Sequence, residues 1–272
     1  MTVPASLYLA GALMAAAILA VLAALARRRA RRLEHLVADA DVKLERLQQQ
    51  FERFVPAEVV ERLTGERAAF TPSRRQVTIL FADLRGFTAM CDHLDPGVVV
   101  TILNGYFERM NEAIVGHHGH ITDVAGDGLL ALFGALEPNP WQASDSVLAA
   151  LAMRAELARY NEHLRSRALP ELRFGVGIHS GEVVAGVMGT GELSKFGVAG
   201  DPINVASRVE GLTRVHGVDL LITEEIRAAL KDRFRLREMP AAQVKGKVDA
   251  IVTYHVEGLA QDPPSASPPG KA

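Results

Sequence analysis

Two aspartates, Asp83 and Asp127, occupy positions that suit a bound metal ion. Asp83 ends the apolar run VTILFAD, which we expect to be a buried strand, and Asp127 lies in AGDG at the tip of an expected hairpin. If these strands are neighbours in a sheet, both carboxylates come to one end of it. Two carboxylates there repel each other unless a hard divalent cation lies between them. A glycine turn at Gly86 would leave backbone N–H groups free to face phosphate oxygens, so the sequence predicts a metal and phosphate site.

A second set of polar residues lies on a predicted helix in the segment VAGDPINVASRVEGL. Asn204 and Arg208 are four residues apart and share one face of that helix. The guanidinium of Arg208 on an otherwise apolar helix needs an anionic partner, either a phosphate or an acid such as Glu210 or Glu182. Lys245 in VKGK lies in a glycine turn before the last predicted strand, and by itself it is equally expected of a solvated turn.

The elements that position these residues follow the order strand, helix, hairpin, helix, strand. This order predicts a ferredoxin-like α+β fold. A linker at 67–76 leads into it, and glycine-punctuated strands follow the second helix at 171–189. The expected elements are a strand at 77–83, an amphipathic helix at 94–118, hairpin strands at 120–126 and 129–134, helices at 141–167 and 202–217, and strands at 218–223 and 250–256.

The N-terminal segment predicts a membrane anchor. Ser6 to Ala26 is a run of 21 residues without a charge, close to the length of a transmembrane helix. The cluster RRRARR follows at once and places the C-terminal side in the cytoplasm by the positive-inside rule. We therefore expect a single-pass protein of the inner cell membrane with its main domain in the cytoplasm.

Residues 33–54 carry apolar side chains at alternating spacings of four and three. This heptad pattern predicts a parallel two-stranded coiled coil, and the alternative is an amphipathic helix packed on its own domain. The expected organisation is a transmembrane helix at 6–26, a cytoplasmic helical linker at 27–65, a main domain at 70–257 and a disordered tail at 258–272.

Composition excludes several other classes of protein. The chain has 272 residues and a formal net charge of −2, which gives no bias toward nucleic acid as a partner. A single cysteine, Cys91, cannot form an internal disulfide framework. His117, His118 and His120 lie at an expected helix–strand junction without acidic partners nearby, and they predict a solvated turn rather than a metal site.

Five ordered motifs carry a family resemblance. The segments VTILFADLRGFT, AGDGLLALFG, GVGIHSGEVVAGVMG, GDPINVASRVEGL and VKGK resemble those of the class III adenylyl and guanylyl cyclase catalytic domain. The resemblance covers roughly residues 70–257. It implies a head-to-tail homodimer with active sites in the interface between the two chains, so a monomer should be nearly inactive.

The resemblance also implies roles for the polar residues. Asp83, Asp127 and the Leu84 carbonyl match the groups that hold two divalent cations, Mg²⁺ or Mn²⁺. Asn204 and Arg208 match the pair from the other protomer that orients the ribose and stabilises charge on the α-phosphate. The implied reaction forms a 3′,5′-cyclic nucleotide and pyrophosphate from a purine nucleoside triphosphate.

The implied contacts with the substrate phosphates involve two segments. The backbone of Gly86, Phe87 and Thr88 would face the phosphate oxygens, and Lys245 matches a lysine that contacts the terminal phosphates.

The base-selecting positions depart from the adenylyl cyclase pattern. Asp123 stands where those enzymes usually carry a lysine, and Gly197 where they usually carry aspartate or threonine. A carboxylate accepts the N1–H and N2–H donors of guanine, whereas adenine presents a donor and an acceptor on that edge. Adenylyl cyclases are the commoner bacterial members of the family, so we expect ATP as the substrate and keep GTP as the alternative.

An alternative of another class is a non-catalytic, nucleotide-binding dimeric module that signals through the coiled coil. The absent base-selecting pair favours it. The presence of both metal aspartates and of the Asn204 and Arg208 pair speaks against it, because a decayed site would be free to lose them.

Overall fold

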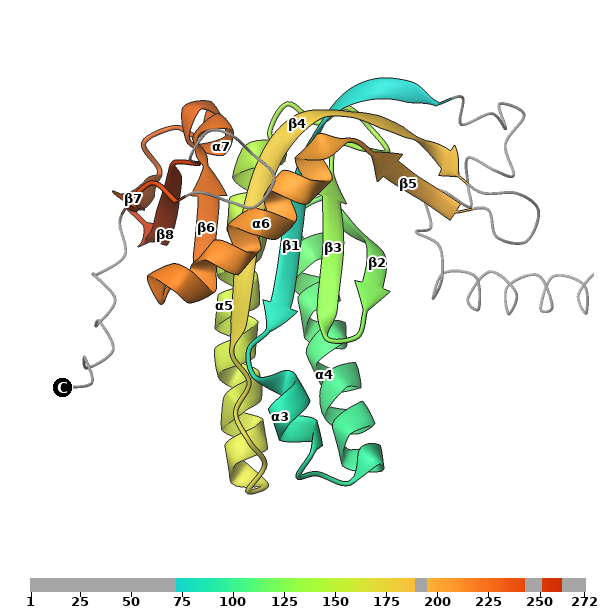
Figure 1. Ribbon diagram of the computed structural model, residues 1–272, viewed down its shortest axis with the longest axis vertical. Helices are drawn as coiled ribbons and strands as arrows, with labels where there is room; N and C mark the ends of the chain where they lie inside the picture. Colours follow the sequence, from blue (N-terminus) through green and yellow to red (C-terminus); the bar gives the residue numbers. More distant parts are fainter. Residues whose placement is uncertain (1–71, 189–194, 243–250, 261–272) are drawn as a thin grey trace, which may run out of the picture. The chain divides into compact units, whose positions relative to one another are not determined.

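The computed structural model describes residues 72–188, 195–242 and 251–260, whose strands form an eight-stranded sheet (Figure 1). Its order is β2-β3-β1-β4-β6-β8-β7, and β5 pairs with β4 outside this path. The strands are β1 (Ser73–Leu84), β2 (Gly119–Ala125), β3 (Gly128–Phe133), β4 (Phe174–Met188), β5 (Lys195–Ala199), β6 (Leu220–Thr223), β7 (Phe234–Glu238) and β8 (Thr253–Leu259). The helices are α3 (Phe87–Cys91), α4 (Pro96–Val115), α5 (Gln142–Ser166), α6 (Asp201–His216) and α7 (Glu224–Ala229).

The first part of this sheet has the predicted ferredoxin-like order. Along the chain β1, α4, β2, β3, α5 and β4 follow one another, and in the sheet β1 lies between β3 and β4. Both neighbours of β1 are antiparallel to it. The end of β1 and the turn between β2 and β3 therefore lie at the same end of the sheet, as Figure 1 shows.

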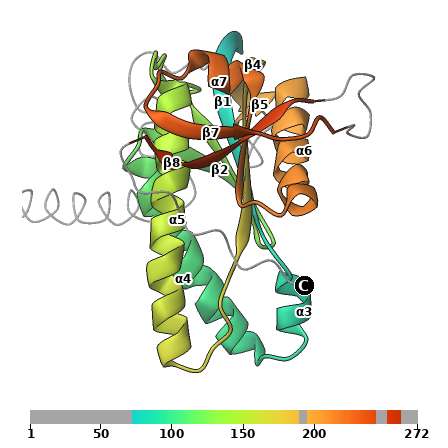
Figure 2. The same ribbon diagram turned by 90° about the vertical axis from the view of Figure 1, so that its left-hand side faces the viewer.

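Helices α4 and α5 cover one face of the sheet, and α6 lies on the other side (Figure 2). Alternation along β1 divides its side chains between the two faces, because successive residues of a strand point in opposite directions. Leu80 and Ala82 pack in the cluster that includes residues of α4 and α5. Val77 and Ile79 pack in a second cluster that contains Ala206 of α6.

The two long helices form where an apolar stripe recurs every three to four residues. Helix α4 begins at Pro96, and the side chain of Asp95 accepts a hydrogen bond of 2.8 Å from the Gly97 N–H. The sequence predicts an apolar stripe of Leu103, Phe107, Met110 and Ile114 on this helix, and of these Met110 and Ile114 are buried. Leu103 and Phe107 are only partly buried, because Ile102 and Tyr106 occupy the centre of the contact instead.

Several predicted boundaries and elements differ from the structure. The predicted linker at 67–76 was wrong at its end, because β1 already begins at Ser73 and pairs with β4 from that residue. The glycine-punctuated region 171–189 contains one strand of 15 residues rather than several. Strand β8 continues to Leu259, the second residue of the predicted tail. Strand β5, helix α7 and strand β7 were not predicted at all.

The N-terminal expectations lie outside the residues that the structure describes. They are the transmembrane helix at 6–26 and the linker with its coiled coil at 27–65. In the described ranges, no helix has the length and apolar character required to cross a membrane.

Candidate active site

Asp83 and Asp127 are brought to one end of the sheet, as the sequence predicts. Asp83 is the penultimate residue of β1, and Gly128, the residue after Asp127, lies against it: a Cβ atom on Gly128 would be 3.3 Å from Asp83 Oδ1. Burial raises the pKa of Asp83, and the negative charge of Asp127 raises it further. The positive charge of Arg214 and a hydrogen bond from the Leu84 backbone N–H act in the opposite direction.

The hairpin that carries Asp127 has a two-residue turn. Ala125 pairs with Gly128, so the turn residues are Gly126 and Asp127 rather than Asp127 and Gly128. Gly126 has φ +64°, a conformation that side-chain-bearing residues rarely adopt. The glycine before Asp127 therefore makes the turn, and Asp127 is held at its tip.

The segment after Asp83 turns away from the sheet at Gly86. This glycine has φ +70° and precedes the short helix α3, and the Arg85 N–H is fixed by a hydrogen bond of 2.7 Å to the Arg173 carbonyl. Phe87 is half-buried and packs against the main core, whereas Thr88 is exposed. Lys245, the other predicted phosphate ligand, lies outside the described residues.

Two residues of α6 that sequence reasoning did not place at this site lie close to it. The charge of Arg214 acts on Asp83, and Asp83 in turn acts on Glu210. Burial and the charges of Asp83 and Asp127 raise the pKa of Glu210 from its ordinary value of 4.5 to about 7, although Arg214 and Arg85 oppose this rise. The spacing of four indicates only that Glu210 and Arg214 share one face of α6, so no sequence signal placed them at this site.

Tyr106 of α4 lies beneath the same carboxylates. Its side chain is fully buried, and within the described ranges its hydroxyl has no hydrogen-bond partner. Burial raises the pKa of Tyr106, and the negative charges of Asp83 and Asp127 add to this effect. An apolar stripe alone could not have singled out this hydroxyl.

Asn204 and Arg208 lie elsewhere on α6. Pro202 contacts Gly181 of β4, whereas Glu210 contacts Gly175, the residue that pairs with Asp83. The first turns of α6 thus lie farther along β4 from Asp83, and Arg214 rather than Arg208 is the cation whose charge acts on Asp83. Asn204 is exposed.

Arg208 has an unused hydrogen-bond donor. Its Nη1 is buried and, among the residues placed by the structure, has no partner. The predicted alternative of a salt bridge to Glu182 is wrong, because Glu182 pairs with Arg74 at 2.6 Å. Glu210, the other acid considered, lies beside Arg214, Arg85 and Asp83.

The two predicted base-selecting positions lie on strands that approach each other. Asp123 is exposed and pairs with Leu130 after a bulge in β2, so its side chain projects on the same face as Leu130. Gly197 lies on β5 and pairs with Gly186. The rings of His120 in β2 and Phe196 in β5 are 6.2 Å apart between centroids, although β2 and β5 are not paired. In the described structure, a Cβ atom on Gly197 would meet no atom within 4 Å.

The three histidines lie around the start of β2, and His120 is part of that strand. His118 Nδ1 lies 3.3 Å from Asp145 Oδ2, so the expectation of no acidic neighbour was wrong for this residue. The predicted solvated turn was wrong for His120, which is buried in β2, and burial lowers its pKa to about 4. In the parts of the chain that the structure describes, no cluster of three or more His, Cys, Asp or Glu side chains could hold a metal ion.

The chemistry of the donors at Asp83 and Asp127 suits a hard cation. The two carboxylates repel each other at a partly buried strand end, and a cation between them would remove this repulsion. Two carboxylates leave most positions of a Mg²⁺ ion for water and substrate phosphate, which is how this ion is usually bound.

The comparison with known proteins agrees with this geometry. Residues 71–258 match the family described as "Adenylate and Guanylate cyclase catalytic domain". The chain is 33% identical over 214 residues to adenylate cyclase 1 of Rhizobium meliloti (strain 1021), covering 77% of this chain and 32% of that protein. It is 34% identical over 226 residues to the adenylate cyclase of Anabaena cylindrica, covering 79% of this chain and 44% of that protein.

A similar solved structure is named a guanylyl cyclase, whereas the two curated relatives are named adenylate cyclases. The crystal structure of the guanylyl cyclase Cya2 superposes with a TM-score of 0.66 at 35% identity, covering 70% of this chain and 95% of that one. The chain spans less than half the length of the two curated relatives but nearly all of this solved domain.

Proposed function

Because this chain belongs to the adenylate and guanylate cyclase family, we propose that it converts a purine nucleoside triphosphate into a 3′,5′-cyclic nucleotide and pyrophosphate. The observation that carries the proposal is the approach of Asp127 to Asp83: burial raises the pKa of the Asp83 carboxyl, and the negative charge of Asp127 raises it further. In the reaction the ribose 3′-oxygen forms a bond to the α-phosphorus, the bond to the bridging oxygen of pyrophosphate breaks, and the 3′-hydroxyl proton leaves.

Asp83, Asp127 and the Leu84 carbonyl would hold two divalent cations, Mg²⁺ or Mn²⁺. When bound, such ions lower the pKa of the 3′-hydroxyl and neutralise charge on the leaving pyrophosphate. The two side chains have defined tasks in this scheme. Bound cations would offset the repulsion between the two carboxylates, and the turn at Gly126 keeps Asp127 aligned with the end of β1.

Backbone and side-chain donors would hold the triphosphate. The chain leaves β1 through the left-handed residue Gly86, so the N–H groups of Phe87 and Thr88 at the start of α3 are not used by a strand partner. Lys245 would add a point charge on the terminal phosphates.

Asn204 and Arg208 would act on the substrate bound to the carboxylates of a second chain. Their distance along α6 from the residues that reach Asp83, and the unused donor on Arg208, both favour a site built from two protomers. Arg208 would stabilise charge on the α-phosphate and Asn204 would orient the ribose.

Mixing two inactive variants tests the two-chain site. Asp83→Asn and Arg208→Ala each remove one half of every site in a homodimer, whereas a mixed dimer has one site with both defects and one intact site. After subunit exchange in an equal mixture, we expect about one quarter of the parental activity to return, since about half of the dimers are mixed. An active site contained within one chain predicts no recovery.

ATP is the proposed substrate, and GTP is the second candidate. Both curated relatives reported above are named adenylate cyclases. The observation that favours GTP is the exposed carboxylate of Asp123 together with the open space at Gly197, an arrangement able to accept the two donors of guanine.

Residues 6–26 would anchor the protein in the inner membrane with the cyclase domain in the cytoplasm, and residues 33–54 would assist dimerisation. The uncharged run, the arginines after it and the heptad pattern support this organisation. Removing residues 1–54 should lower specific activity mainly at low protein concentration. Equal activity of the shortened and full chains at every dilution would count against a dimerising role.

Turnover of the purified protein with ATP and GTP separately, with Mg²⁺ or Mn²⁺, tests the proposed function. Cyclic AMP in excess supports the ATP assignment, and cyclic GMP in excess supports GTP. Asp83→Ala should abolish either activity. Nucleotide binding without any product would instead favour a non-catalytic signalling module.

A further inference from the structure

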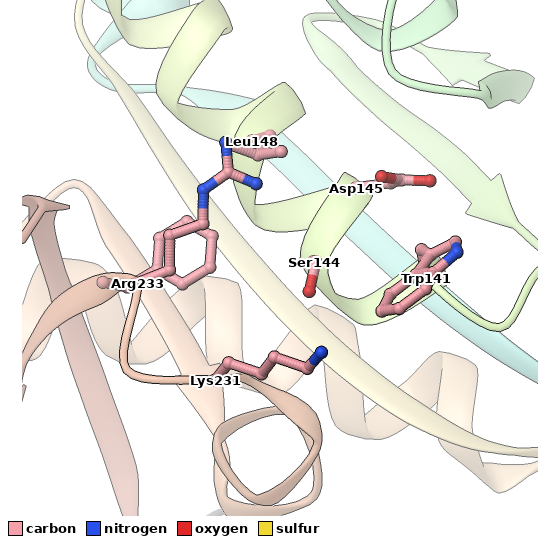
Figure 3. A pocket seen from close by; sticks show the side chains of 7 residues that line it. Trp141, Ser144, Asp145, Leu148, Lys231 and Arg233 are labelled. Atoms are coloured by element: carbon pink, nitrogen blue, oxygen red, sulfur yellow. The ribbon is translucent and has the colours of Figure 1, made fainter.

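A pocket of about 230 Å³ lies between the start of α5 and the loop that joins α7 to β7 (Figure 3). It is distinct from the carboxylate site at the end of β1. Leu148 and Phe234 supply apolar surface, and Trp141, Lys231 and Arg233 supply an aromatic ring and two cations.

Trp141 is the only tryptophan in the sequence, and it is 58% exposed. Its ring lies 5.1 Å from the Lys231 ammonium, measured to the ring centroid. An exposed indole beside cations offers a flat apolar surface with a charged rim, which is the kind of surface on which proline-rich segments bind.

The charge of the pocket is not balanced within it. Figure 3 shows the carboxylate of Asp145 directed away from Lys231 and Arg233. Asp145 is engaged by Asn139 at 2.8 Å and by His118 at 3.3 Å. Within the described ranges, neither Lys231 nor Arg233 has a carboxylate partner.

The described chain ends beside this pocket. Leu259 of β8 pairs with Phe234, which lines the pocket, and the Ala260 N–H donates a hydrogen bond of 2.9 Å to the Arg233 carbonyl. The segment that follows Ala260 therefore begins next to Arg233. Its sequence is QDPPSASPPGKA, with Asp262 directly before Pro263 and Pro264.

We propose that residues 261–272 bind in this pocket, with Asp262 beside Lys231 and Arg233 and the two following prolines against the Trp141 ring. The charges are complementary, and the prolines favour an extended chain that has little freedom to lose on binding. A chain in the extended polyproline II form advances about 3.1 Å per residue, so such a segment would carry Pro263 roughly 9 Å from Ala260.

The tryptophan fluorescence of the protein comes from Trp141 alone, because the full chain has no other tryptophan. The experiment compares acrylamide quenching of the full chain with that of a chain ending at Ala260. Deletion should raise the quenching constant about twofold, since covering one face of a half-exposed indole removes roughly half of its collision surface. Adding the peptide QDPPSASPPGKA to the shortened chain should reverse the change.

Two variants of the full chain separate the proposed contact from a general effect of the tail. The triple variant Asp262→Ala, Pro263→Ala and Pro264→Ala should have the quenching constant of the shortened chain. The matched control, which carries Ser265→Ala and Ser267→Ala, should have the quenching constant of the parent.

Three outcomes overturn the proposal. The first is equal quenching in the full and shortened chains. The second is a peptide that leaves the quenching constant of the shortened chain unchanged. The third is protection of Trp141 that survives deletion and fades on dilution, because a second copy of the chain then covers the pocket.

Discussion

The backbone of Glu210 in α6 lies directly over Gly177 of β4. A Cβ atom on Gly177 would come within 2.1 Å of the Glu210 amide nitrogen and 2.6 Å of the Ala206 carbonyl oxygen. The contact joins two backbones, and neither can rotate away as a side chain could. It fixes the height of α6 above the sheet and hence the position of Asn204 and Arg208.

Gly177→Ala should therefore lower the free energy of unfolding by roughly 2–3 kcal/mol, because a methyl group must displace the helix. Gly211→Ala is a matched control on the same helix. Gly211 is exposed and, within the described structure, nothing lies within 4 Å of a Cβ there. This control should stabilise the protein by about 0.5–1 kcal/mol. Chemical denaturation measures both, and an unchanged midpoint for Gly177→Ala would show that the helix is free to shift.

Glu210 should make stability depend on pH in the absence of divalent cations. Its pKa is raised from 4.5 to about 7, so between these values the folded state keeps a proton that the unfolded chain has released. The contribution of Glu210 to the free energy of unfolding is therefore fully present below about pH 4.5 and is lost as the pH rises toward 7. Glu210→Gln removes this loss, and the variant should gain stability relative to the parent at pH 8 but not at pH 5.

Thermal unfolding at the two pH values measures this difference. Glu112→Gln, a change at an exposed residue of α4, is the control and should follow the parent at both. A Glu210→Gln variant whose stability relative to the parent does not change with pH would contradict a raised pKa.

Tyr106→Phe should stabilise the protein by about 1 kcal/mol, because it removes a buried hydroxyl that has no partner in the described structure. Tyr160→Phe is the opposite case, since the Tyr160 hydroxyl donates a hydrogen bond of 3.0 Å to the Ile102 carbonyl. Its loss should destabilise the protein by a similar amount. Denaturation midpoints measure the effect of each variant on stability. Destabilisation by Tyr106→Phe would mean that the Tyr106 hydroxyl has a partner in solution.

Asp123→Lys should raise the ratio of kcat/KM for ATP to that for GTP by at least about tenfold, because a lysine cannot accept the guanine donors. Val124→Lys places the same charge one residue later on the other face of β2, and Val124 is also exposed. The ratio for this control should stay at the parental value. Assays of both products under one set of conditions measure it, and equal shifts in the two variants would assign the effect to charge alone.

The sequence was sufficient for the parts of the fold that follow from local pattern. The βαββαβ order, both long helices and the approach of Asp83 to Asp127 were predicted, because hydrophobic period and turn residues are local signals. The turn itself was predicted one residue late, since Gly126 rather than Gly128 takes the left-handed conformation.

What the sequence did not predict depends on packing between distant segments. Glu210 reaches Asp83 only because three glycines of β4 let α6 lie close to the sheet, which no pattern within α6 reveals. Strand β5 is short and glycine-containing, and it is defined by its pairing with β4. The place of Tyr106 beneath the carboxylates likewise depends on how α4 crosses the sheet.

The central pairing of the sheet joins segments that are far apart in the chain. Thr78 of β1 lies opposite Ser180 of β4, and their hydroxyls, 102 positions apart, form a hydrogen bond of 2.5 Å. Contacts at such separations slow folding to milliseconds or seconds. At a synthesis rate of about 5–20 residues per second, roughly 5 to 20 s pass between the synthesis of β1 and that of β4. Throughout that interval one edge of the apolar strand β1 is unpaired. We therefore expect the newly made chain to be prone to aggregation and to benefit from a chaperone.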